Sequence, residues 1–264
     1  MHNIQISRGF LLSLVVLALG CGGGDPEAVS AEDADESVTV TSTESALTAE
    51  VADEVAQPAS NTAEQLAADA TTRVPTHFTP TGCATAVQAG PKVTYTLTNC
   101  TGRYGLVSVS GTVVATYSRA GAGGVAVQVT STGLKANQAT LDVNATVVST
   151  RAGTVKTATV SSNASGTGPR GASLTRNGDY VVTYDEATEC ITVNGSWKTG
   201  SGARQSTTAV ANYARCKGAC PTSGSIVHDT SRGPVVTIVY SGQATATWST
   251  SGGRTGTLNL ICSK

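Results

Sequence analysis

Apolar and small polar residues alternate with a period of two along much of the chain after residue 92. The pattern is clear in Val93, Tyr95 and Leu97, and it returns in the run 141–147. Such alternation puts successive side chains on opposite faces of a β-strand, and no stretch of this region keeps a helical period. The sequence therefore predicts an all-β domain of about 10–13 strands, arranged as an antiparallel β-sandwich or as one strongly curved sheet.

Glycine-containing turns separate the predicted strands. The tetrapeptide Arg176-Asn177-Gly178-Asp179 predicts a type I′ hairpin turn, because Asn and Gly both tolerate a positive φ. The predicted strands are 93–97, 107–117, 125–129, 141–147, 180–184, 191–197, 209–213, 235–240, 244–248 and 258–262.

One motif occurs three times: a Ser-Gly or Asn-Gly pair with an aromatic residue six positions after the glycine. The aromatic residues are Tyr117, Tyr184 and Trp248. Three such rings on one surface would stack on sugars, whereas three recurring hairpins would put the rings in the core. Because aromatic residues make up only 4% of the chain, we expect the few that there are to be core residues.

A short apolar run, 10–19, stands near the N-terminus behind Arg8. It is too short to cross about 30 Å of hydrocarbon, so it predicts a signal peptide. The run is followed by Gly20 and Cys21, and the sequence Ala18-Leu19-Gly20-Cys21 resembles the lipobox of bacterial lipoproteins. An ordinary secretion signal with an incidental cysteine is the alternative.

The lipobox resemblance implies a location as well as a modification. Residues 1–20 would be removed, and Cys21 would be acylated and become the mature N-terminus. Two or more acyl chains hold a protein firmly on a bilayer, so the resemblance implies a lipid-anchored protein of the cell envelope. Gly22 after the cysteine favours the outer membrane.

The segment 21–75 is poor in large apolar residues and strongly acidic. We expect a disordered tether, because such a segment cannot bury enough surface to offset its ordering entropy. It contains twelve acidic residues against Arg73 alone, whereas the domain predicted at 76–264 has fifteen Lys and Arg against six acids. An acidic tether of about minus eleven thus precedes a basic head of about plus nine.

Six cysteines remain in the predicted domain once Cys21 is set aside. In an exported domain an even number predicts disulfides, and we expect the pairs Cys83–Cys100, Cys216–Cys220 and Cys190–Cys262 among the fifteen possible connectivities. A zinc site made by Cys216, Cys220 and His228 is the alternative, but it lacks the usual four-ligand signature.

Known catalytic motifs are absent from the sequence. It has no nucleophile elbow, metalloprotease, Walker or dinucleotide-binding motif, and we expect no cofactor, no metal and no nucleic-acid partner. Only His77 and His228 are available as catalytic bases outside the signal peptide. The acids Asp185, Glu186 and Glu189 would suit a glycoside hydrolase, but a solvated loop is the simpler interpretation.

Many arginines lie close to glycines, which predicts that they sit at turns. If several turns share one end of the fold, Arg119, Arg170 and Arg254 would form a cationic rim for phosphate or carboxylate groups. We therefore expect a non-catalytic head that binds an acidic polysaccharide or lipopolysaccharide. The alternatives are a lipid or lipoprotein carrier with an apolar cavity, and a hydrolase of unrecognised type.

Overall fold

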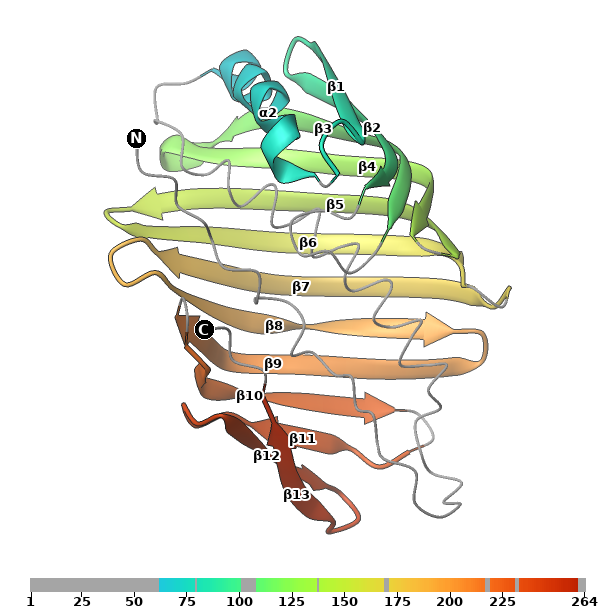
Figure 1. Cartoon of the computed structure of the whole chain (residues 1–264), viewed down its shortest axis with the longest axis vertical. Coiled ribbons are helices and arrows are strands. Elements are labelled where there is room, and N and C mark those ends of the chain that lie inside the picture. The colour runs from blue at the N-terminus through green and yellow to red at the C-terminus, as the bar shows by residue number, and fades with distance from the viewer. Residues whose placement is uncertain are drawn as a thin grey trace.

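A computed structural model describes residues 62–78, 80–100, 108–136, 138–168, 171–216, 219–230 and 233–260. This part of the chain forms one α-helix followed by a single antiparallel sheet of 13 strands (Figure 1). Its elements are α2 (Ala63–His77), β1 (Ala84–Ala89), β2 (Lys92–Cys100), β3 (Val109–Ala120), a short 3-10 turn (Gly121–Gly123), β4 (Gly124–Ala136), β5 (Ala139–Ala152), β6 (Val155–Thr167), β7 (Ser173–Asp185), β8 (Cys190–Ser201), β9 (Arg204–Cys216), β10 (Pro221–Thr230), β11 (Val236–Val239), β12 (Thr245–Thr250) and β13 (Thr255–Asn259).

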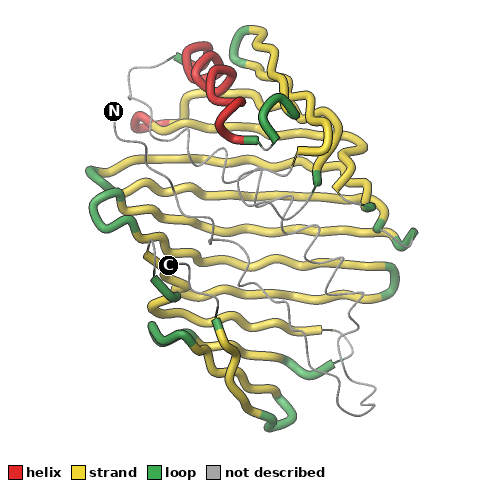
Figure 2. The backbone as a smooth tube through the Cα atoms, viewed as in Figure 1, coloured by secondary structure: helices red, strands yellow, loops and turns green. Residues whose placement is uncertain are grey.

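The sheet is a plain meander, in which each strand pairs with the next one in the chain. The long strands β4–β9 run side by side across the middle, and the strands at both ends of the sheet turn away from their direction (Figure 2). The prediction of an all-β fold is confirmed. The sandwich alternative is wrong, because the described strands belong to one sheet and not to two.

One face of the sheet, here called the inner face, carries the buried side chains. The strand register aligns Val93, Ala115, Val129 and Ala145 in a row across β2–β5, and all four are buried. Residues between them in the strands, such as Thr146, point to the opposite, outer face and are exposed. The period-two alternation of the sequence therefore reflects the different polarity of these two faces.

The helix α2 covers part of the inner face near β1, β2 and β3. Leu66, Ala70 and Val74 lie on one side of the helix at intervals of one turn and are buried in the core. Thr62 and Gln65 form a capping box that fixes the first turn. The predicted disordered tether is thus wrong for residues 63–75, because this apolar stripe gives the segment a surface to pack on.

The buried residues form two clusters. The larger one joins α2 to the inner face of β2–β7 and includes Leu134, Leu141 and Leu174. The smaller one lies on β8–β12 and is built around Trp197, Tyr213 and other residues, namely Val210, Ile226, Ile238, Tyr240 and Ala246. Tyr117 belongs to the first cluster and Trp248 packs against the second, as expected for core aromatics. Tyr184 belongs to neither cluster; it is half-buried, and Lys156 Nζ lies 5.8 Å from the centre of its ring.

Glycines face aromatic side chains in the second half of the sheet. Gly178 on β7 is paired with Trp197 on β8, and a methyl group added to Gly178 would lie 2.9 Å from Trp197 Cβ. Two positions along, Gly195 on β8 is paired with Tyr180 on β7. The predicted hairpin turn at Asn177-Gly178 is therefore wrong. Gly178 lies inside β7 because its missing side chain leaves room for Trp197.

Candidate functional site

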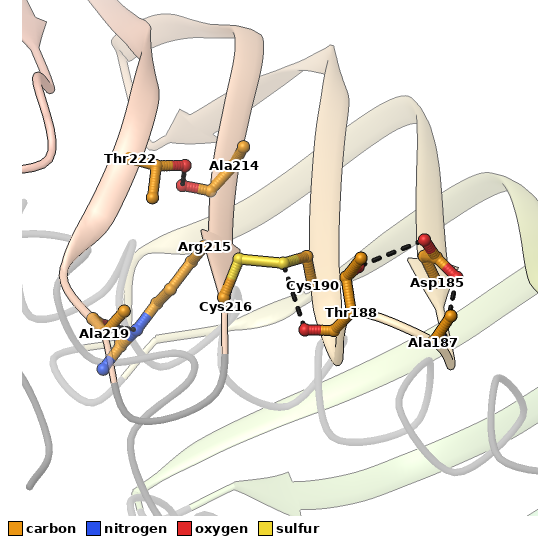
Figure 3. Close-up of a disulfide and its surroundings, with 9 residues drawn as sticks. All are labelled: Asp185, Ala187, Thr188, Cys190, Ala214, Arg215, Cys216, Ala219 and Thr222. Carbon is orange, nitrogen blue, oxygen red and sulfur yellow. Dashed lines mark hydrogen bonds between the residues drawn. A yellow bond between two sulfur atoms is a disulfide. The ribbon is translucent and has the colours of Figure 1, made fainter.

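The acidic residues predicted as possible catalytic groups are part of the turn between β7 and β8. Asp185 accepts hydrogen bonds from Ala187 N at 3.0 Å and Thr188 Oγ1 at 3.1 Å (Figure 3). The hydrogen bond from the Ala187 amide is the main reason why the pKa of Asp185 is lowered. This carboxylate holds the turn together in its ionised form.

Glu186 is bound to two cations near the turn between β5 and β6, one at the end of β5 and one at the start of β6. Arg151 Nη2 lies 2.6 Å from its Oε2, and Lys156 Nζ contacts its Oε1. The hydrogen bond from Lys156 is the largest cause of its lowered pKa. A general acid of a glycoside hydrolase needs a raised pKa, so neither Asp185 nor Glu186 has the properties of one. The geometry favours the loop interpretation of this acidic cluster.

Within the described residues, two disulfides join neighbouring parts of the sheet. Cys83–Cys100 is present as predicted. Cys190 is joined to Cys216 (Figure 3), so the predicted pairs Cys216–Cys220 and Cys190–Cys262 are wrong. The meander explains the difference, because the start of β8 and the end of β9 are adjacent and put Cys190 directly opposite Cys216.

The predicted zinc alternative fails with this pairing. Cys216 is not a thiolate ligand, since its sulfur is in a disulfide, and Cys220 is also disulfide-bonded. No cluster of three or more His, Cys, Asp and Glu side chains that would hold a metal occurs in the described ranges. Cys262 lies outside those ranges.

His228 is a half-buried residue of β10 on the inner face. Its Nδ1 is 2.8 Å from Thr208 Oγ1 on β9, and desolvation lowers its pKa. A catalytic triad needs a histidine between a serine nucleophile and a carboxylate. The printed partner of His228 is the hydroxyl of Thr208, so this pair is not such a triad. The side chain of His77 lies outside the described part of the chain.

The arginines predicted to form one cationic rim do not come together. Arg119 is at the end of β3 where the chain turns into β4, and Arg254 is in the turn between β12 and β13. Successive turns of a meander alternate between its two ends, and the strand order puts these two turns at opposite ends of the sheet. Arg170 lies outside the described residues.

Two other arginines are buried on the inner face. Arg176 on β7 is 3% exposed, and its guanidinium lies 4.9 Å from the centre of the Trp197 ring. Arg215 on β9 is also 3% exposed, and its Nε donates to Ala219 O at 3.0 Å (Figure 3). Arginine is rarely buried in a protein core, so these two residues are the strongest candidates for a functional role.

Sequence reasoning missed both arginines. The Asn177-Gly178 pair predicts a turn at Arg176, although Leu174, Arg176, Gly178 and Tyr180 are two residues apart and so lie on the same face of β7. This alternation of side chains is visible in the sequence. The Asn-Gly pair outweighs it, because such a pair strongly favours a turn.

Comparisons with protein-family models, with characterised proteins and with solved structures gave no significant match. Among the described helices, none has both the length and the apolar character needed to span a bilayer.

Proposed function

We propose that this chain is a lipid-anchored protein of the cell envelope with a β-sheet head that binds an acidic polymer without catalysis. Gly22 after the cysteine favours the outer membrane as its location. The observation that carries the proposal is the charge of residues 76–264, which contain fifteen Lys and Arg against six Asp and Glu. A guanidinium presents several N–H donors in a plane that matches carboxylate and phosphate groups. The basic head as a whole attracts such polymers over a longer range.

The anchor is tested through Cys21. Replacing Cys21 with Ser removes the thiol to which the acyl chains would be attached, so the protein should move from the membrane fraction to the soluble fraction. Metabolic labelling with a fatty-acid analogue checks the modification directly. Wild-type protein without label would show that the run 10–19 is an ordinary secretion signal.

Polymer binding is tested on the Cys21→Ser chain, which keeps the complete head. We expect polygalacturonate and lipopolysaccharide to bind, with affinity falling at least tenfold as salt shortens the Debye length from roughly 14 Å to about 4 Å. Dextran, which is uncharged, serves as the control. Equal binding of dextran, or binding that ignores salt, would contradict the proposal.

A lipid carrier is the second candidate, because the inner face of the described sheet is apolar over β2–β6. A carrier of this kind would bind a fluorescent lipid, and the amount of bound lipid would rise with the amount of protein. Salt would weaken that binding little, because the burial of acyl chains is not an electrostatic interaction. Measuring both ligands on the same preparation therefore separates the two candidates.

A further inference from the structure

The outer face of the sheet carries hydroxyl and amide groups in the middle strands. We call its residues in the ranges 140–150 of β5, 157–167 of β6, 173–183 of β7 and 192–198 of β8 the outer lattice. On β6 every member is a hydroxyl or an amide, and the members are Thr157, Thr159, Ser161, Asn163, Ser165 and Thr167. The other strands add Thr140, Asn144, Thr146, Thr150, Ser173, Thr175, Asn177, Thr183, Thr192, Asn194 and Ser196.

Charge is almost missing from the outer lattice, although most of it is exposed. Its charged members are Asp142, Asp179 and Lys198, and its apolar members are Val148 and Val181. A surface that serves only solubility is usually about 25–35% charged. The rest of the basic head keeps its many cations away from this surface, so its composition indicates a partner without net charge.

The lattice is regular because its strands pair without interruption. The pairings of β5 with β6, β6 with β7 and β7 with β8 contain no register shift, whereas irregularities interrupt the pairings of β4 with β5 and of β8 with β9. One row of the lattice is Asn144, Asn163 and Asn177, and another is Thr150, Thr157, Thr183 and Thr192. Neighbours in a row are one strand spacing apart, which is about 4.8 Å.

These four strands are also unusually flat. Three steps of ordinary twist, at about 20–25° a step, would turn β8 by roughly 60–75° from β5. Figure 1 shows β5, β6, β7 and β8 running nearly parallel across the sheet, and Figure 2 shows the same paths. Flat sheets are uncommon and are often held by ladders of like side chains. The outer lattice is therefore a level surface of repeating groups.

The polar groups of the lattice are not used to hold the protein together. Within the described part of the chain, none of the outer side chains of β6 forms a hydrogen bond to another protein group. On β7, the same is true of Thr175 and Asn177. Polar groups of this kind bind water or a ligand instead. Their donors and acceptors are thus available along the whole length of the lattice.

The composition does not suit most macromolecules. The aromatic residues of β5–β8, which are Tyr180, Tyr184 and Trp197, lie on the inner face, so the lattice offers no ring for stacking on sugars. Nucleic acids and anionic lipids need clustered cations. Protein interfaces are enriched in aromatic residues and arginine and poor in serine. A surface built from small hydrogen-bonding groups in rows fits a partner that is itself an ordered array of such groups.

Ice is an array with a matching spacing. Hydrogen-bonded oxygens are about 2.75 Å apart, so two waters bound to the same tetrahedral neighbour are separated by roughly 4.5 Å. The strand spacing of about 4.8 Å differs from this by roughly 0.3 Å a step. Over the three steps from β5 to β8 the difference adds up to only about 1 Å. Rotation of the hydroxyl and amide side chains is sufficient to absorb it.

We propose that the outer lattice is an ice-binding surface, which holds the protein on a growing crystal through its rows of hydroxyl and amide groups. Ice then has to grow between the bound molecules with a curved front, which slows its growth. This activity goes beyond the binding of an acidic polymer and does not depend on it, because the lattice has almost no charge.

The test measures recrystallisation of ice in the presence of the Cys21→Ser chain, which keeps the complete head. Thin frozen films in sucrose solution are held just below the melting point, and the size of the ice grains is followed over time. We expect the protein to keep the grains small. Ser161→Tyr puts a bulky ring in the middle of the lattice, and it should raise the protein concentration needed about tenfold or more, because neighbouring rows lose their contact with the ice.

Ser249→Tyr is the matched control. Ser249 is an exposed outer-face residue of β12, outside the lattice, so this variant should act like the parent chain. Tyrosine is well accepted in strands, and equal melting temperatures of the three proteins verify that they are folded.

The inference is overturned if the parent chain leaves grain growth unchanged. It is also overturned if Ser161→Tyr and Ser249→Tyr inhibit equally, or if both lose inhibition. Binding of polygalacturonate should be the same in all three proteins. Loss of ice binding with intact polymer binding therefore leaves the proposed function standing, and the converse result leaves the ice-binding surface standing.

Discussion

Gly195→Ala should lower the free energy of unfolding by about 3–4 kcal/mol, more than other single-methyl additions at glycines in turns. An added Cβ would lie 2.5 Å from Asp179 O and 2.5 Å from Tyr180 Cα, which are backbone atoms of the paired strand. Gly195 also has a φ of 152°, a conformation that L-residues rarely adopt. Urea denaturation of the wild-type protein and of the Gly195→Ala variant measures the difference in free energy of unfolding.

Gly202→Ala is the matched control. Gly202 has a φ of 56° but no atom within 4 Å of an added Cβ, so the substitution should cost only about 1 kcal/mol. A similar loss of stability in both variants would mean that backbone conformation alone decides the effect. The close approach of β7 and β8 at Gly195 would then have no energetic role.

Leu66→Ala should destabilise the protein by about 3 kcal/mol. The side chain is fully buried between α2 and the sheet, where it belongs to the larger apolar cluster. Truncation leaves a cavity between the helix and the inner face, and the neighbouring core residues can only partly fill it. Thermal unfolding followed by circular dichroism measures the loss.

Glu64→Ala is the control for this helix. Glu64 is exposed in the first turn of α2, and its removal should cost only a few tenths of a kcal/mol through the helix dipole. Equal, small effects of both substitutions would show that α2 contributes little to the core. Residues 63–75 would then be helical without stabilising the domain, and the predicted boundary of the domain near residue 75 would hold for stability.

The fold class was predictable because the two faces of the sheet differ in polarity. Where the difference is weak, prediction failed: β6 contains Thr, Ser, Asn and Ala in place of large apolar residues, and no strand was expected at 155–167. The strand β10 was missed for the same reason. Pairing with neighbours on both sides, rather than local sequence, keeps these two strands in the sheet.

The candidate site was much less predictable than the fold. Cysteine spacing does not define which strands are adjacent, so Cys190–Cys216 required the register of β8 and β9. The arginines near turns were recognised, but their separation between the two ends of the sheet depends on the strand order. Arg176 and Thr199 are far apart in sequence, and only the pairing of β7 with β8 makes them neighbours.

The unbroken meander has a consequence for the order in which the chain folds. Each strand needs only the preceding strand as its partner, so sheet contacts have a low contact order for a β-protein. A chain that emerges N-terminus first during its synthesis can add strands in sequence, each on the edge left by the one before. Folding can thus proceed vectorially from β1 to β13, without waiting for distant segments to arrive.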